Sequence, residues 1–459
     1  MLFESTRGGD KGKTFEEVLL KGLADDGGLY IPTEWPQADI SKLKECNSFI
    51  DIAKLIVPLF TESSYKKEEV VTLLENTWHN FEKSDLVGIK KINEDIFIGE
   101  LFHGPTAAFK DFGLQLAAAF FNKVLESENK TAIVLGATSG DTGSAAIDAC
   151  KNYDRIKSFI MLPNGNMSEV QQRQMSTIKS SNIFALKING TFDDCQDLVK
   201  QAFQKRDFLS TNQYLLAVNS INWTRIIGQI CYYFYAYNQL SKKGNLNFSI
   251  PTGNFGNVFA CYSAHKMGLP VDKISVAVNN NDILHRFFNE NDYSQRSVCE
   301  TISPSMDISV ASNFERLVYD LFLDRDASQC AEMFENFPIK PIELDISIWN
   351  KKKNLFSSCM VNDFDTENMI KRTYQSDSYL LDPHTAVAAV EAFSKSDKNN
   401  HYVLLSTAHP AKFPKVYEKL NIKINSSPTS LKGLFKKDEY LHTLDADYNK
   451  ITNFIKLNN

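Results

Sequence analysis

The chain has 459 residues, of which 43% are hydrophobic and 23% charged, a composition typical of a globular protein with two or three domains. Its formal net charge of −6 argues against nucleic acid or an anionic membrane as a partner, and no apolar run is long enough for a transmembrane helix. The polar N-terminus and the eight scattered cysteines, which include no C-x-x-C pair, predict a cytoplasmic protein without a zinc site or disulfides.

The first part of the chain, residues 1 to about 90, is predicted to be a mainly helical domain. Thr14 is a candidate cap for a helix that begins at Phe15, because a glutamate follows three residues later. Apolar residues then recur with helical spacing over residues 50–60 and 68–81.

From about residue 95, short β-branched segments alternate with helical ones. This alternation predicts an α/β fold with open, mainly parallel sheets that bind ligands at the carboxyl ends of their strands. The tail from about residue 425 is rich in lysine and asparagine and is expected to be a solvated appendage with a helix near residues 448–455. Strands are predicted over residues 96–98, 133–135, 158–162, 183–186, 214–218, 248–250, 274–278 and 402–405, and helices over 114–124, 191–208, 223–240 and 258–267.

One lysine, Lys110, lies in a nearly uncharged, aromatic-flanked segment between a predicted strand and a predicted helix. Burial at such a junction disfavours the ammonium form and lowers the pKa of the lysine. A neutral amine can attack an aldehyde such as that of pyridoxal phosphate (PLP). The competing interpretation is a lysine that merely extends to solvent at a helix start.

Two glycine-rich loops follow, each leading from a predicted strand into a helix. They are Leu135–Ala146 and Ile250–Val258. Backbone N–H groups and hydroxyls at a helix N-terminus bind carboxylate or phosphate, although a plain strand-to-helix turn is the alternative. Neither loop has the spacing of a nucleotide triphosphate or dinucleotide site.

Two further segments carry polar groups near predicted element ends. Ser406–Phe413 follows a strand, so its hydroxyls could contact a ring nitrogen or simply cap the strand end. Asp382–Val387 is interpreted as a helix start capped by Thr385, with a structural histidine at position 384.

Taken together, these segments resemble the threonine synthases, which are members of the fold type II PLP-dependent enzymes. The resemblance covers most of the chain, and its long motifs occur in one order. They are Ser5–Gly8, Gly22–Pro32, His103–Gly113, Gly136–Gly143, Asn219–Arg225, Pro251–Asn257, Ser303–Ile308, Ser312–Arg316, Leu381–Val387 and Ser406–Phe413.

The resemblance implies a role for each matched position. Lys110 would be the catalytic lysine that anchors PLP and carries protons, and Thr407 the neutral partner of the pyridine nitrogen. Asp141 stands where many relatives have an asparagine near the PLP phenolic oxygen, and a carboxylate there would repel the phenolate unless it is protonated or turned away. The loop for the cofactor phosphate would be Gly253, Asn254, Phe255, Gly256 and Asn257, and the loop for the substrate carboxylate Thr138, Ser139, Gly140 and Thr142.

The family substrate, O-phospho-L-homoserine, brings a second phosphate that needs cations. The candidates are Arg173, Arg225 and Arg316, each of which could equally be a structural salt-bridge partner. The implied reaction is γ-elimination of phosphate followed by addition of water, which gives L-threonine and completes threonine biosynthesis. PLP is the only cofactor expected, with no metal.

The implied architecture is that of tryptophan synthase β-like enzymes, two open, mainly parallel sheet domains with a helical N-terminal extension. Residues 91–459 would form the catalytic region, with a smaller α/β subdomain at about 118–215 inserted in the larger one. The alternatives are a related phospholyase that gives 2-oxobutyrate, a β-replacing enzyme acting on serine, and a catalytically inactive binding protein, against which Lys110 argues. The sequence does not give the oligomeric state.

Overall fold

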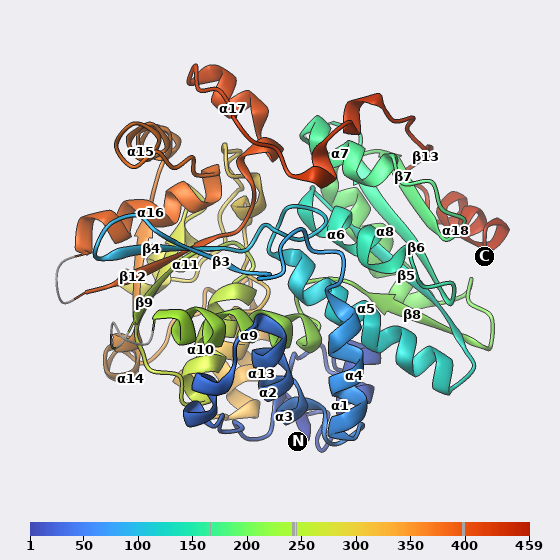
Figure 1. Ribbon diagram of the computed structural model, residues 1–459. Coiled ribbons are helices and arrows are strands. Elements are labelled where there is room, and N and C mark those ends of the chain that lie inside the picture. Colours follow the sequence, from blue (N-terminus) through green and yellow to red (C-terminus); the bar gives the residue numbers. More distant parts are fainter. Residues whose placement is uncertain (166, 241–243, 245, 397–399) are drawn as a thin grey trace.

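The computed structural model describes residues 1–459 except 166, 241–243, 245 and 397–399, and it confirms the α/β fold with two mainly parallel sheets (Figure 1). The larger sheet occupies one side of the molecule and the smaller sheet the other, with the N-terminal helices below them in this view. The chain between β4 and α5 runs through the middle, between the two sheets.

The larger sheet has six strands, in the order β11-β10-β9-β12-β4-β3. All its pairs are parallel except that of the edge strand β3, which runs antiparallel to β4. Helix α16 (Pro383–Lys395) packs on β9, β10 and β12, and the six residues of β9 are all buried, as expected for a covered parallel sheet. The strands are β3 (Gly88–Lys91), β4 (Ile96–Glu100), β9 (Leu246–Pro251), β10 (Val271–Val278), β11 (Phe356–Met360) and β12 (Tyr402–Ser406).

The smaller sheet has five strands, all parallel, in the order β13-β7-β6-β5-β8. They are β5 (Thr131–Ala137), β6 (Ile156–Pro163), β7 (Ile183–Asn189), β8 (Gln213–Ala217) and β13 (Leu441–Asp445). Helices α6 (Asp141–Cys150), α7 (Glu169–Ser176), α8 (Phe192–Lys205) and α18 (Tyr448–Leu457) accompany this sheet.

The C-terminal tail is not a solvated appendage, so that expectation was wrong. The tail crosses from the larger sheet to the smaller one, where β13 pairs with β7 and α18 buries Ile451 and Ile455 against the sheet (Figure 1). The many lysines and asparagines of the tail lie on its outer face and hid the apolar residues, which recur at helical spacing on the inner face.

The N-terminal region is helical, as predicted, and packs on the central helices. Phe15 contacts Phe120 with ring centroids 4.9 Å apart, and Phe49 contacts Phe112 at 5.1 Å. Thr14 caps the first helix by accepting a hydrogen bond from the N–H of Glu17. The elements are β1 (Phe3–Ser5), β2 (Tyr30–Pro32), α1 (Phe15–Lys21), α2 (Phe49–Ile56), α3 (Pro58–Thr61) and α4 (Lys67–Thr77). The domain boundary near residue 90 stays a prediction.

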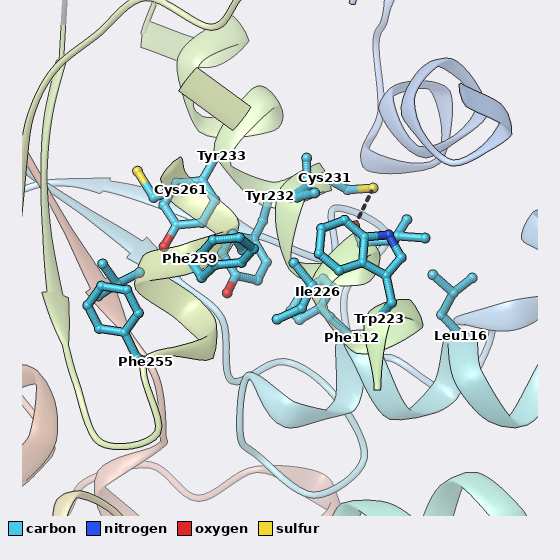
Figure 2. Close-up of a cluster of buried hydrophobic side chains, with 14 of the residues drawn as sticks. Phe112, Leu116, Trp223, Ile226, Cys231, Tyr232, Tyr233, Phe255, Phe259 and Cys261 are labelled. Carbon is cyan, nitrogen blue, oxygen red and sulfur yellow. Dashed lines mark hydrogen bonds between the residues drawn. The ribbon is translucent and has the colours of Figure 1, made fainter. Parts of the chain in front are cut away.

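The main core lies around α5 (Lys110–Ser127), α9 (Trp223–Leu240) and α10 (Gly256–Lys266). Figure 2 shows Phe112 of α5, Trp223 of α9 and Phe259 of α10 in one cluster of apolar side chains. Helices α5 and α9 cross closely, because a Cβ at Gly113 would lie 2.8 Å from the carbonyl oxygen of Arg225. This approach brings the starts of α5 and α9, and hence Lys110 and Arg225, to the same place.

The remaining helices surround the larger sheet or connect its strands. They are α11 (Ile283–Glu290), α12 (Phe314–Leu317), α13 (Ala327–Asn336), α14 (Ile346–Lys352), α15 (Asp363–Ser376) and α17 (Pro414–Lys419). Short 3-10 segments include η6 (Pro410–Lys412), which follows β12 and leads into α17.

Candidate active site

The predicted site residues follow the carboxyl ends of strands from both sheets, as the topology rule requires. Lys110 comes after β4, Asp141 after β5, Gly253 after β9 and Thr407 after β12. All four line one cavity, together with Phe109, Thr142, Ser220, Arg225, Gln229, Pro251, Thr252, Asn254, Phe255, Gly256, Asn257, Ser305, Met306 and His384.

The loop before Lys110 is held by the chain that follows β12. The N–H of Phe109 donates to the carbonyl of Thr407 at 2.9 Å, and the N–H of His409 donates to the carbonyl of Ala107 at 3.1 Å. Helix α5 begins at Lys110, four residues earlier than predicted, so the lysine sits on its first turn. Its side chain is only 12% exposed, and its Nζ lies 5.2 Å from the centre of the Phe109 ring.

The carboxylate of Asp141 lies between two lysines. Lys110 Nζ is 3.4 Å from Asp141 Oδ2, and Lys412 Nζ is 2.7 Å from Asp141 Oδ1. Burial lowers the pKa of Lys110, Asp141 raises it, and the charges of Lys412 and Arg225 lower it further. Burial alone would raise the pKa of Asp141, but Lys412, Lys110 and His384 hold it well below its usual value. Asp141 is therefore an ionised carboxylate rather than a protonated acid.

The second glycine-rich loop leaves hydrogen-bond donors free at the start of α10. The Oδ1 of Asn257 accepts hydrogen bonds from the hydroxyls of Tyr232 and Tyr233, which fixes the amide, while the buried Nδ2 has no partner. A Cβ at Gly253 would lie 2.6 Å from the carbonyl oxygen of Ser305, so only glycine fits there. The loop thus presents backbone N–H groups and an unused amide to the cavity.

Arg225 is a buried cation that faces the cavity from α9. One of its terminal nitrogens donates to the carbonyl of Val218 at 2.9 Å, and its Nε has no partner in the described residues. Burial lowers the pKa of Arg225 to about 10, and no acidic group contributes to the shift. An unpaired buried guanidinium is costly in an empty protein and favours binding of an anion.

The other two arginines do not line the cavity. Arg173 pairs with Glu169 and Glu439 and lies over the ring of Phe435. Arg316 is fully buried and donates to the carbonyls of Tyr30 and Ile221 and to the side chain of Asn313. Both have the protein partners of a structural arginine, and a part for either in substrate binding stays a prediction.

The first glycine-rich loop only partly faces the cavity. Thr142 lines it beside Asp141, whereas the hydroxyl of Thr138 accepts hydrogen bonds from the N–H groups of Gly140 and Gly143 within the loop itself. Ser139 is exposed. Thr138 therefore shapes the loop, and the N–H groups at the start of α6 remain candidates for carboxylate binding.

Sequence reasoning missed His384 and Ser305 as site residues. The Nδ1 of His384 lies 3.0 Å from Asp382 Oδ1, and its Nε2 accepts a hydrogen bond from the Ser305 N–H at 3.1 Å. The cap of α16 is Asp382, not Thr385 as predicted, since Asp382 accepts from the N–H groups of His384 and Thr385. The hydroxyl of Thr385 donates to the Asp382 carboxylate and also lies 3.2 Å from the Ser406 hydroxyl at the end of β12.

Three family models match the chain in sequence order. One described as the threonine synthase N terminus matches residues 2–78, one described as a pyridoxal-phosphate dependent enzyme matches 82–335, and one described as the threonine synthase C-terminal region matches 385–455. A threonine synthase from Pseudomonas aeruginosa is 41% identical, with 99% of this chain and 98% of that protein covered. The chain belongs to the threonine synthase family. The cofactor of the chain is PLP.

Solved structures of this family have the same fold throughout. A PLP-bound threonine synthase from Brucella melitensis superposes with a TM-score of 0.94 at 37% identity, covering 99% of both chains. Threonine synthase from yeast superposes with a TM-score of 0.92 at 36% identity, covering 100% of this chain and 98% of that one. In the part of the chain that the structure describes, no helix is long and apolar enough to span a bilayer, and no cluster of metal-ligating side chains is found.

The residues that line the cavity are suited to bind PLP. The cofactor phosphate needs buried donors, which Asn257 Nδ2 and the loop N–H groups supply. An aldehyde needs a poorly solvated amine, which Lys110 supplies. Thr407 lines the same cavity and is 5% exposed as a residue, which suits a neutral hydroxyl partner for a ring nitrogen.

Proposed function

We propose that this chain converts O-phospho-L-homoserine and water to L-threonine and phosphate. The observation that carries the proposal is the shared cavity, in which the amine of Lys110 lies among donors for more than one anion. The substrate carries a carboxylate and a phosphate, and the cofactor carries a second phosphate. Arg225, the loop at the start of α10 and the loop at the start of α6 are three separate groups of donors for them.

PLP, when bound, supplies an electron sink for carbanion chemistry at the substrate. Lys110 would anchor the cofactor, and its amine would be the base that takes and returns protons at the substrate carbons. Its low exposure keeps bulk water from reprotonating these carbons in competition. We propose Lys110 as the catalytic residue on this basis.

The remaining predicted residues bind and orient. Gly253–Asn257 holds the cofactor phosphate, and Thr407 meets the pyridine nitrogen as a neutral hydroxyl. Thr138, Ser139, Gly140 and Thr142 form the loop for the substrate carboxylate, with Thr138 acting through its hydrogen bonds to the loop backbone. Asp141 stays ionised near the ring, where the ion pair with Lys412 compensates its charge. Arg225 is the candidate for the substrate phosphate, because its charge has no acidic partner.

The site of action is inferred to be the cytoplasm. Each of the eight cysteines lies in the described part of the chain and is a free thiol, which is the state that a reducing compartment maintains. The net charge of −6 supports a small-molecule substrate rather than nucleic acid.

The decisive experiment is to incubate the PLP-loaded chain with O-phospho-L-homoserine and to separate the products by chromatography. We expect threonine and inorganic phosphate in equal amounts, with 2-oxobutyrate a minor product. Homoserine without the phosphate should not react, because it lacks both the leaving group and an anchor whose binding energy positions the reacting carbons. If 2-oxobutyrate is the main product, the chain is a phospholyase. If neither product forms, the proposed reaction is wrong and only the conclusions about fold and cofactor stand.

A further inference from the structure

A second buried lysine, Lys412, lies in the site, and the proposed reaction does not use it. It ends η6, the short segment after β12, and its residue exposure is 0%. A lysine without access to water is rare unless it is paired, because the ammonium loses its hydration. The contacts of Lys412 therefore indicate what it is retained for.

The side chain and the backbone of Lys412 join four segments. Its Nζ lies 2.7 Å from Asp141 Oδ1 and donates to the carbonyl of Thr106 at 2.8 Å. Its own carbonyl accepts a hydrogen bond from the hydroxyl of Ser168, the residue that caps α7. Lys412 is thus held in one place relative to the loop before Lys110 and to the start of α6.

The two oxygens of Asp141 are not equally engaged. Oδ1 is bound by Lys412 at 2.7 Å and by Gln171 Nε2 at 2.8 Å, whereas Oδ2 is 3.2 Å from the Ser305 hydroxyl and 3.4 Å from Lys110. Charge-assisted hydrogen bonds weaken as they lengthen, so the carboxylate pairs mainly with Lys412. The interaction between Lys110 and this carboxylate is the weaker of the two.

The charges that face these groups come from five elements. Lys110 of α5 faces Asp141 of α6, Lys412 of η6 and Arg225 of α9, and Asp141 also faces His384 of α16. The Asp141 carboxylate therefore interacts with three groups that are or can become cations, namely Lys412, Lys110 and His384. Of the two lysines, Lys412 has the shorter ion pair, so Lys110 is the lysine that releases its proton more easily.

We propose that Lys412 is a positioning residue that holds the Asp141 carboxylate and so leaves Lys110 as the lysine that presents a free amine. This inference rests on the proposed role of Lys110 as the cofactor anchor. Without Lys412, the negative charge of Asp141 would be compensated mainly by Lys110, which would raise the pKa of Lys110 and keep its amine protonated. The arrangement of two lysines around one aspartate then has a physical purpose, since the two lysines have different partners and different proton affinities.

The test is the pH dependence of cofactor attachment, which does not depend on turnover. The full-length chain is stripped of PLP and mixed with fresh PLP over a pH series, and the rate of the absorbance change reports the fraction of free amine. Lys412→Met removes the charge at similar length and should raise the pH midpoint by about one unit. Lys412→Arg keeps the charge and should stay near the wild-type midpoint.

A double variant covers the case in which Lys412→Met does not fold. Asp141→Asn with Lys412→Met removes one charge of each sign, and if Lys412 already holds the carboxylate the midpoint should stay within about half a unit of wild type. A fall by more than about one unit would show that Asp141 serves Lys110 directly, and would overturn the proposal. An unchanged midpoint in Lys412→Met would overturn it as well.

Borohydride reduction and peptide mass spectrometry keep the two proposals apart. Attachment at Lys110 with no shift of the midpoint in Lys412→Met contradicts the role of Lys412 alone. Attachment at a different lysine in the wild type contradicts the anchor assignment itself, and with it the proposed function of Lys110.

Discussion

Lys110 and Lys123 lie on the same helix, yet their surroundings differ. Lys110 is in the cavity on the first turn of α5, while Lys123 lies toward the other end of the helix, where it pairs with Glu69 and its side chain is 27% exposed. The difference decides which of the two can act as an amine nucleophile, because only a poorly solvated lysine is easily deprotonated near neutral pH.

Lys110→Ala is expected to lower threonine formation by several orders of magnitude, since the anchor and the base are lost together. The cofactor phosphate should still bind to the loop at α10, so PLP content at saturating cofactor should remain measurable. Lys123→Ala is the matched control and should keep near wild-type turnover. Steady-state assays with dialysed protein check both, and retained turnover in Lys110→Ala would contradict the assignment.

The two buried arginines provide a second comparison. Arg225→Met should leave the melting temperature nearly unchanged, because only the Val218 carbonyl loses a partner, but it should raise the KM for O-phospho-L-homoserine at least about tenfold. Arg316→Met should cost about 3 kcal/mol, because it leaves two carbonyls and an amide unpaired, with little change in KM for the folded fraction. Calorimetry measures the stability of both variants and steady-state kinetics their KM. A large loss of stability in Arg225→Met together with a raised KM in Arg316→Met would contradict both assignments.

Asp111, the neighbour of Lys110, gives a prediction about pH. Burial raises its pKa to about 7, and the charge of Asp148 adds to the shift, against hydrogen bonds from Thr106. The folded state then binds more protons than the unfolded state between pH 4 and 7, so this group makes the protein less stable as pH rises through that window. Asp111→Asn should flatten the fall in melting temperature between pH 4 and 7. Parallel slopes for wild type and variant would contradict the shift.

At the scale of elements, the sequence predicts what depends on local pattern. The buried strands of both sheets were found, because their apolar β-branched runs are continuous, and so was α9 with its bounds at Trp223 and Leu240. The edge strands β3, β11 and β13 were missed, because each is partly exposed and has no such run, whereas the edge strand β8 has one and was found.

The same limit applies to the site. Lys110, Thr407 and the loop at Gly253 could be predicted because each lies in a motif with its own chemistry. The parts played by His384, Ser305 and Lys412 could not, because they come from contacts between segments far apart in the sequence. The Lys412 carbonyl, for example, meets Ser168 across 244 positions.

The loop at the start of α10 predicts the outcome of Gly256→Val. A Cβ at Gly256 would meet Asn313 and Ile226 only at 3.4 and 3.6 Å, so the fold should tolerate a side chain, whereas an approaching phosphate would not. We expect the affinity for PLP to fall at least about tenfold, with the melting temperature of the PLP-free chain within a few degrees of wild type. Titration of PLP followed by absorbance measures the effect, and equal PLP content at limiting cofactor would contradict it.

Helix α18 offers a matched pair for the role of the tail. Ile455 is fully buried against the smaller sheet, whereas Leu457 is 85% exposed. Ile455→Ala should destabilise this sheet by about 2–4 kcal/mol, and Leu457→Ala by less than about 0.5 kcal/mol. Hydrogen exchange at the amides of β7 reports the local effect, and equal protection in the two variants would show that the tail does not stabilise the sheet.

For the whole molecule, the N-terminal region is part of the common core rather than a separate attachment. Phe15 and Phe49 pack on α5, and the Arg316 guanidinium binds the Tyr30 carbonyl across 286 positions. A chain that begins at residue 91 should therefore expose this apolar surface and aggregate, and adding residues 1–90 as a separate polypeptide should partly restore solubility. A soluble, PLP-binding 91–459 fragment would instead establish residues 1–90 as an independent domain.

The late position of β13 also affects how the protein is made. The Asn189 side chain at the end of β7 donates a hydrogen bond to Asp445 of β13, 256 positions later. A ribosome that adds about 5–20 residues per second needs roughly 10–50 s to deliver the missing strand after β7 has emerged. For that time the smaller sheet has an open, hydrogen-bonding edge that any other extended chain can occupy. The edge of β7 is thus most prone to pair with a wrong strand while the polypeptide is still on the ribosome. Pairing with β13 removes this exposed edge once the tail has been synthesised.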